Sequence, residues 1–121
     1  MKRELVRRGL VVFLFLVFAG SLYMTKTKGV TASYYGTVTD ADTEEVLQGA
    51  SVVLYVYYQG DPDPYIADTD TTDSNGNYTV SYNKGSNVEA TYLHFSKSGY
   101  QSEYHEVDTG GQRKDVDLNP V

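Results

Sequence analysis

The sequence predicts an all-β protein, a seven-stranded antiparallel β-sandwich that follows an apolar N-terminal helix. Three observations lead to this prediction. From Ser33 onward, short runs rich in Val, Thr and Tyr alternate with clusters of Gly, Asp, Asn and Pro at intervals of about ten residues. No stretch of this region shows sustained helical periodicity. The chain has 121 residues and no Cys, so one small domain must be held together without disulfides.

Residues 1–32 are expected to form an export segment. A basic start precedes an apolar run over residues 10–24, and Lys26 and Lys28 follow it. A helix of this length rises about 22 Å, less than the roughly 30 Å of a membrane's hydrocarbon core. That length is typical of a signal peptide, whereas the flanking lysines favour an uncleaved anchor, and both interpretations stay open. Because most of the basic residues precede the run, the positive-inside rule places the rest of the chain outside.

Charge divides the chain in the same way. Residues 1–32 hold six basic side chains and one acidic side chain, out of 10 and 16 in the whole sequence. The domain expected over residues 33–121 therefore carries four basic and fifteen acidic side chains, a net charge of −11. A domain this acidic repels phosphate backbones, so no nucleic-acid partner is expected.

The expected strands follow the turn signals and cover residues 33–39, 50–58, 66–72, 77–82, 88–96, 100–107 and 113–118. The second is the clearest, because Val52, Leu54 and Val56 alternate with Tyr55 and Tyr57. One of its faces is therefore aliphatic and the other aromatic. The residues expected to face the core are Val38, Val52, Leu54, Val56, Ile66, Tyr78, Val80, Leu93, Phe95, Val116 and Leu118.

Five short motifs occur in order along this region: Gly36-x-Val38-x-Asp40, Leu47-x-Gly49-Ala50-x-Val52, Thr72-Asp73-x-x-Gly76-x-Tyr78, Gly99-Tyr100 and Asp117-Leu118-Asn119-Pro120. Over residues 34–120 the series resembles the carboxypeptidase regulatory-like domain, a transthyretin-like β-sandwich. The resemblance implies a Greek-key fold and structural roles for the motif residues. It also implies an accessory module that has no catalysis of its own.

The sequence contains few residues in patterns typical of an active site. It has no His-x-x-Glu metal motif, and its only histidines, His94 and His105, fall on different expected strands. Its C-terminus lacks the Tyr-Arg-Gly-Ser segment of the hydroxyisourate hydrolases, the enzymes of the wider transthyretin-like fold. We therefore expect a chain that is not an enzyme, with no catalytic residue and no cofactor.

The acidic stretch over residues 68–73 is a weak candidate for a cation site. Asp68 and Asp70 share one face of an extended strand, and Asp73 follows them. Calcium needs six to eight hard oxygen ligands, but the spacing does not match a calcium-binding loop. We favour the alternative, in which these side chains form a solvated strand face that runs into a hairpin.

The tyrosines are the stronger candidate. By alternation, Tyr35, Tyr55, Tyr57 and Tyr92 point away from the core and offer a binding face for a protein or a glycan. The alternative is that tyrosine occurs here simply because it favours strands. Asn77, in the sequence Asn-Tyr-Thr, is a candidate glycosylation site.

Together these observations predict an exported module, anchored in the cell membrane and facing outward, or secreted if the N-terminal segment is cleaved. It would act in binding or scaffolding at the cell surface, with a partner that the sequence does not identify. The alternative is a structural subunit of a filament or envelope assembly, in which the apolar N-terminal helices of several copies pack together.

Overall fold

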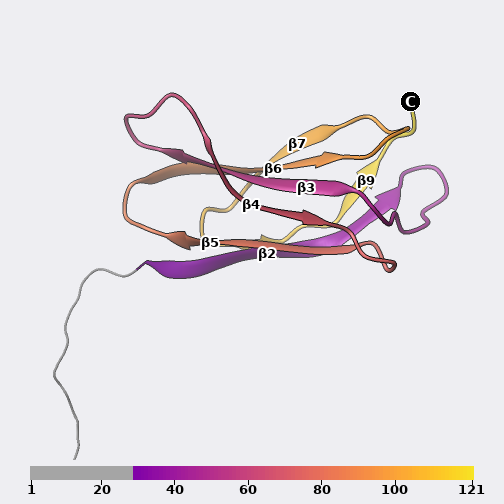
Figure 1. The fold of residues 1–121 in the computed structure, drawn as a ribbon, viewed down its shortest axis with the longest axis horizontal. Helices are drawn as coiled ribbons and strands as arrows, with labels where there is room; N and C mark the ends of the chain where they lie inside the picture. The colour runs from indigo at the N-terminus through magenta and orange to yellow at the C-terminus, as the bar shows by residue number, and fades with distance from the viewer. Residues whose placement is uncertain (1–28) are drawn as a thin grey trace, which may run out of the picture.

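Eight β-strands form the regular secondary structure of residues 29–121, the part of the chain that the computed structural model describes (Figure 1). They are β2 (Val30–Asp40), β3 (Ser51–Tyr58), β4 (Tyr65–Thr71), β5 (Asn77–Lys84), β6 (Val88–Ser96), β7 (Glu103–Val107), β8 (Gln112–Arg113) and β9 (Val116–Leu118). The first strand begins slightly ahead of the domain boundary expected at residue 33. The apolar run over residues 10–24 lies outside the described residues, which themselves include no helix able to cross a membrane.

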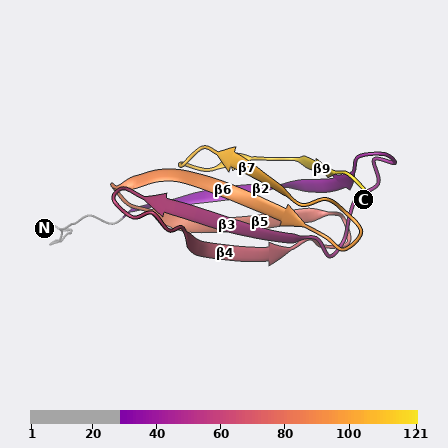
Figure 2. The ribbon, with the colours of Figure 1, turned by 90° about the horizontal axis from the view of Figure 1, so that it is seen from above.

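The strands form two sheets that pack against each other as a β-sandwich (Figure 2). One sheet, here called the β3 sheet, has the order β4-β3-β6-β7, and all its neighbours are antiparallel. The other, the β2 sheet, has the order β5-β2-β8, and β9 pairs with the end of β2. The two layers confirm the predicted all-β sandwich.

The prediction of seven strands, all antiparallel, is wrong at the C-terminal end. Both β8 and β9 run parallel to β2. The chain leaves the β3 sheet after β7 and crosses to the β2 sheet, and a crossover permits parallel pairing where a hairpin does not. The strand expected over residues 113–118 is split at Lys114. The carbonyl oxygen of Lys114 lies so close to Gly36 that a Cβ atom there would stand 2.1 Å from it.

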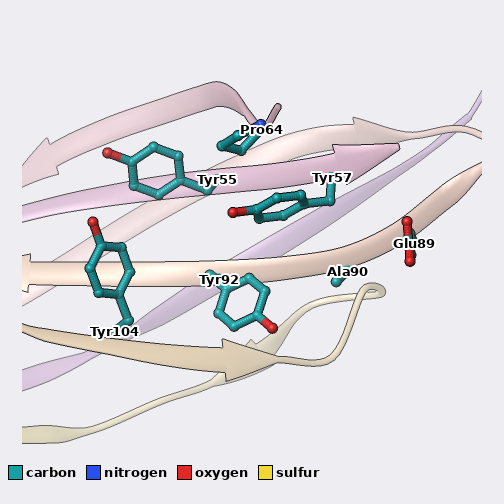
Figure 3. Close-up of a pocket in the computed structure, with 7 residues that line it drawn as sticks. All are labelled: Tyr55, Tyr57, Pro64, Glu89, Ala90, Tyr92 and Tyr104. Atoms are coloured by element: carbon teal, nitrogen blue, oxygen red, sulfur yellow. The ribbon is translucent and has the colours of Figure 1, made fainter. Parts of the chain in front are cut away.

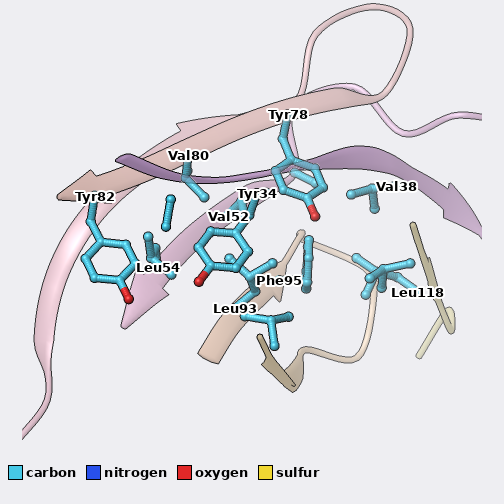
Figure 4. Close-up of a cluster of buried hydrophobic side chains, with 14 of the residues drawn as sticks. Tyr34, Val38, Val52, Leu54, Tyr78, Val80, Tyr82, Leu93, Phe95 and Leu118 are labelled. Atoms are coloured by element: carbon cyan, nitrogen blue, oxygen red, sulfur yellow. The ribbon is translucent and has the colours of Figure 1, made fainter. Parts of the chain in front are cut away.

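The core lies between the two sheets (Figure 4). All but one of the residues expected to face it are buried, namely Val38, Val52, Leu54, Val56, Tyr78, Val80, Leu93, Phe95, Val116 and Leu118. Full burial of an aliphatic or aromatic side chain stabilises a fold by about 1.5–3 kcal/mol relative to exposure. Strand alternation therefore predicts the core well wherever a strand is regular.

Ile66 is the exception, because its side chain is 62% exposed. The register of β4 against β3 pairs Leu54 with Asp68 but Tyr55 with Ile66, so Ala67 is an extra residue in β4. Such a β-bulge shifts the alternation of side chains by one position. Ile66 therefore lies on the outer face beside Tyr55 instead of in the core.

Three tyrosines of the β2 sheet, here called the inner tyrosines, are buried in the core: Tyr34, Tyr78 and Tyr82. Their hydroxyl groups donate hydrogen bonds to the backbone carbonyl oxygens of Asp108, Lys114 and Thr109, at 2.5, 2.7 and 2.7 Å respectively. Burial raises the pKa of all three hydroxyls, because it penalises the charged phenolate form. They hold the segment between β7 and β9 against the β2 sheet.

Asp40, at the end of β2, organises the loop that follows. Its Oδ1 accepts hydrogen bonds from the backbone amides of Asp42 at 2.7 Å and Thr43 at 3.0 Å. Its Oδ2 accepts a hydrogen bond from the Tyr100 hydroxyl at 2.7 Å. These donors, led by the Thr43 amide, lower the pKa of the Asp40 carboxyl, because they stabilise its charged form. Tyr100 thus joins the turn after β6 to the loop after β2.

Candidate functional site

A groove of about 600 Å³ lies on the outer face of the β3 sheet (Figure 3). We call it the tyrosine groove. The residues that line it are Tyr55, Tyr57, Pro64, Glu89, Ala90, Tyr92 and Tyr104. Four of these residues are tyrosines, and they come from β3, β6 and β7. Three of them, Tyr55, Tyr57 and Tyr92, belong to the outward tyrosine face expected from the sequence.

The strand register brings these rings together. Tyr55 and Tyr57 are two residues apart on β3, so both point outward, and Tyr92 of β6 is paired directly with Tyr55. The rings of Tyr57 and Tyr92 meet edge to face, with centroids 5.7 Å apart. Tyr104 of β7 extends the row, its ring centroid 6.2 Å from that of Tyr55. Aromatic pairs in this range of distances attract each other, so the rings stabilise one another in place.

His94 packs against Tyr104 at one end of the row of tyrosines. It is paired with Tyr104 across β6 and β7, and the two ring centroids lie only 4.3 Å apart. Burial lowers the pKa of His94, so its imidazole is neutral at neutral pH. His94 is therefore an uncharged support for the Tyr104 ring.

The one charged residue in the lining is placed there by an irregularity. The register of β6 pairs Ala90 with Tyr57 and Val88 with Tyr58, which leaves Glu89 as an extra residue. A bulge of this kind turns a side chain away from the alternation of its strand. Figure 3 shows Glu89 beyond Ala90, at the end of the groove opposite Tyr104.

The four tyrosines expected to form one face do not all lie together. Tyr55, Tyr57 and Tyr92 share the groove, but Tyr35 belongs to β2 in the opposite sheet, where it is 47% exposed. Alternation shows which side chains point outward but not which sheet a strand joins. Tyr104 was missed, although the inward position of Val107 three residues later places it on the outer face.

The acidic stretch has a structural role at an edge of the sandwich. The Oδ2 atoms of Asp68 and Asp70 in β4 accept hydrogen bonds from the backbone amides of Ser81 and Thr79 in β5, at 2.9 and 2.8 Å. Their Oδ1 atoms accept from the amides of the residues that follow them in β4. The two carboxylates therefore bridge the edge strands of the two sheets and satisfy amides that would otherwise be unpaired.

The other two candidates lie nearby, in and just after the turn between β4 and β5. This turn is not the hairpin expected from the sequence, because β4 and β5 belong to different sheets. Asp73 accepts hydrogen bonds from the amides of Asn75 and Asn77, both at 2.9 Å. Within residues 29–121 no group of His, Asp and Glu side chains is arranged to hold a metal ion. Asn77, the candidate glycosylation site, is exposed at the start of β5, and its Oδ1 accepts a hydrogen bond from the Thr37 hydroxyl at 2.8 Å.

No protein-family model and no curated protein matches the sequence. Solved structures do resemble it in fold. The chain is similar to 3-chlorocatechol 1,2-dioxygenase from Rhodococcus opacus 1CP, with a TM-score of 0.58 and 13% identity over 77% of this chain and 61% of that one. It is also similar to hydroxyquinol 1,2-dioxygenase from Pseudomonas putida DLL-E4, with a TM-score of 0.57 and 10% identity over 78% of this chain and 58% of that one.

A third similar structure is the C-terminal domain of the shaft pilin spaA from Lactobacillus rhamnosus GG. Its TM-score is 0.54, with 14% identity over 76% of this chain and 99% of that domain. The chain spans only 53–61% of the catechol dioxygenases that it matches. At these identities the likeness shows a shared sandwich fold and nothing finer.

The expectation that the chain is not an enzyme is contradicted by these neighbours, which are mainly catechol and hydroxyquinol dioxygenases. The same sandwich occurs inside catalytic chains, because a fold does not determine the function that it carries. The lack of a His-x-x-Glu motif, on which the expectation rested, therefore does not exclude catalysis.

Proposed function

We propose that this chain is an extracytoplasmic binding module that presents the tyrosine groove to a protein or glycan partner at the cell surface. The observation that carries the proposal is the gathering of four tyrosines from three strands on one outer face. Tyrosine offers a rigid apolar ring with a polar tip, and it is enriched among residues that dominate binding energy. The core already has its own tyrosines, so the groove rings are not required to fill it.

The proposal extends to the kind of sandwich. We infer a transthyretin-like, Greek-key domain related to the carboxypeptidase regulatory-like domain. In support, the motif residues Gly49, Gly76 and Gly99 have φ angles of 83°, 77° and 89°. Only glycine adopts such angles without strain, so each of these three glycines lies where the backbone requires one.

The location of the domain is part of the same proposal. Residues 10–24 would either anchor the domain in the membrane, facing outward, or be removed with a signal peptide. Sequencing the N-terminus of the mature protein distinguishes these outcomes. An intact N-terminus indicates an anchor, and a start near Leu22 or Ser33 indicates a secreted domain.

Replacing two groove tyrosines tests the binding function. We expect the double variant Tyr55→Ser, Tyr57→Ser to lose the ligands that the unchanged chain selects from a peptide-display library and a glycan array. Tyr35→Ser is the matched control, because Tyr35 is an exposed tyrosine on the opposite sheet. Equal melting temperatures would show that both variants are folded. Ligand selection that survives the double substitution, or that Tyr35→Ser also abolishes, would contradict the proposal.

A second candidate function is a structural subunit of a filament or envelope assembly. The observation in its favour is the fold shared with the shaft pilin domain. In this case the apolar N-terminal segments of several copies would pack together. A mature N-terminus at Leu10, together with filaments seen by electron microscopy on cells that produce the chain, would support this candidate over the first.

A further inference from the structure

Charged side chains are distributed unevenly between the two sheets. Within residues 29–121, the strands of the β3 sheet contain no Lys or Arg but five acidic residues, which are Asp68, Asp70, Glu89, Glu103 and Glu106. The strands of the β2 sheet are balanced, with Asp40 and Asp117 against Lys84 and Arg113. Among the strand residues, the net negative charge therefore lies on the sheet that carries the tyrosine groove.

Two of these carboxylates lie at the groove itself. Glu89 is part of its lining, at the end marked by Tyr57 and Ala90. Glu106 of β7 is paired directly with Tyr92, so the two side chains project from the same face of the sheet. The other three serve elsewhere, since Asp68 and Asp70 bridge β4 to β5, and Glu103 contacts the His105 imidazole at 2.7 Å.

Nothing in the described part of the groove balances these negative charges. His94, the one basic residue on this face, is neutral at neutral pH because burial lowers its pKa. The hydroxyl groups of Tyr55, Tyr57, Tyr92 and Tyr104 form no hydrogen bond within residues 29–121, unlike those of the inner tyrosines. The groove thus combines aromatic faces, hydroxyl groups available to a ligand and uncompensated carboxylates.

We propose that the tyrosine groove binds a basic, extended segment of another protein. Lys or Arg side chains of that segment lie over the tyrosine rings, and their charged ends reach Glu89 and Glu106. A cation is attracted to the face of a tyrosine ring, and the attraction adds to that of a nearby carboxylate. The negative potential of the sheet also speeds the encounter with a basic partner. The inference rests on the proposed binding function and names the chemistry of its partner.

Charge complementarity separates this partner from other occupants. A neutral glycan could stack on the rings, but it carries no positive charge to attract the carboxylates. Its binding would therefore not depend on salt. An acidic peptide would be repelled by the five acidic residues of the sheet. A second copy of this chain could offer its own basic residues, which makes self-association an outcome that the experiment must detect.

Three synthetic peptides of equal length test the inference. One consists of Lys-Pro repeats, one of Ser-Pro repeats and one of Glu-Pro repeats, and each carries an uncharged dye. Their binding to the full chain in neutral detergent is measured by fluorescence anisotropy. We expect the Lys-Pro peptide to bind, the Ser-Pro peptide to bind more weakly and the Glu-Pro peptide not to bind. Raising the ionic strength from about 0.05 to about 0.5 M should weaken the Lys-Pro complex, because salt screens exposed charges.

Matched variants locate the contacts. Glu89→Gln should weaken Lys-Pro binding by about three- to fivefold, the size of effect expected for one exposed charge pair. Glu45→Gln removes the same charge from an exposed residue in the loop after β2, and it should leave the affinity unchanged. Tyr57→Ser should weaken binding, whereas Tyr57→Phe, which keeps the ring, should retain most of it.

Each contrary result has a distinct meaning. Equal binding of the Lys-Pro and Glu-Pro peptides, or equal effects of Glu89→Gln and Glu45→Gln, would overturn the inference. A neutral oligosaccharide that binds through Tyr55 and Tyr57 while the Lys-Pro peptide does not would overturn the inference but leave the proposed function standing. Sedimentation could instead show that the chain self-associates and that the Lys-Pro peptide disrupts this self-association. The partner would then be a second copy of this chain and not another protein. If no probe binds through Tyr55 and Tyr57, the proposed function fails as well.

Discussion

The inner tyrosines and the groove tyrosines use the same side chain in opposite ways. Tyr34, Tyr78 and Tyr82 are buried, and each hydroxyl donates to a backbone carbonyl oxygen of the segment between β7 and β9. The groove tyrosines face outward, contact mainly one another and His94, and form no hydroxyl hydrogen bond within the described residues. The difference lies in the surroundings of each ring and not in the residue type.

This comparison indicates that the two groups of tyrosines have different roles. The inner tyrosines hold the segment between β7 and β9 against the β2 sheet, and this segment has few strand residues of its own. In many small exported domains, disulfides link such segments to the rest of the fold. The groove tyrosines form no such hydrogen bonds within the described residues, so we expect them to contribute less to stability. Changes to the inner tyrosines should therefore affect stability more than changes to the groove tyrosines.

The largest effect is expected from Tyr34→Ala. The side chain is fully buried, and its removal would leave a cavity beside Tyr82 in the core, so the free energy of unfolding should fall by about 3–5 kcal/mol. Tyr34→Phe keeps the ring and removes the hydroxyl contacts with the Asp108 carbonyl oxygen and the Thr91 hydroxyl, so it should cost about 1–2 kcal/mol. Urea unfolding followed by circular dichroism measures both. A loss below about 1 kcal/mol for Tyr34→Ala would show that the core does not depend on this ring.

An intermediate effect is expected from alkaline pH. Burial raises the pKa of the inner tyrosines in the folded state above the unfolded value of about 10. Below pH 10 both states keep the protons and stability is unaffected. Above pH 10 the unfolded chain releases protons that the folded chain retains, so stability should fall as the pH rises. Urea unfolding between pH 8 and pH 11 measures this, and Tyr78→Phe should make the decline less steep.

The smallest effect is expected from Tyr104→Ser in the groove. The side chain is 64% exposed, and a substitution of this kind usually changes the free energy of unfolding by no more than about 0.5 kcal/mol. Near-ultraviolet circular dichroism should change nonetheless, because the ring lies against Tyr55 and His94. A cost above about 2 kcal/mol would place Tyr104 among the residues that hold the fold and would end the distinction between the two groups.

Much of the fold could be predicted because it depends on local patterns. The strand over residues 51–58 reads directly as an aliphatic inner face and an aromatic outer face, and the structure confirms both. Ile66 was placed wrongly because one extra residue, Ala67, reverses the pattern, and no composition signal marks a bulge. The parallel pairing of β8 and β9 with β2 was missed for a similar reason, since pairing partners depend on where the chain crosses between sheets.

The candidate site was predicted in part. The outward direction of Tyr55, Tyr57 and Tyr92 was correct, but Tyr35 was grouped with them and Tyr104 was left out. The inclusion of Glu89 in the groove could not be foreseen, because it depends on the bulge in β6. Similarly, the acidic stretch looked solvated, whereas Asp68 and Asp70 bond to amides of a strand in the other sheet.

The sequence by itself determined an all-β domain, its core-facing positions, its acidity and its excess of tyrosine. These are local properties, because alternation and turn chemistry act over a few neighbouring residues. The tertiary structure alone decided which tyrosines share a face, which carboxylates meet them and which hydroxyls are already bonded. Those outcomes depend on the register between strands far apart in the chain, and a shift of one residue moves a side chain to the opposite face.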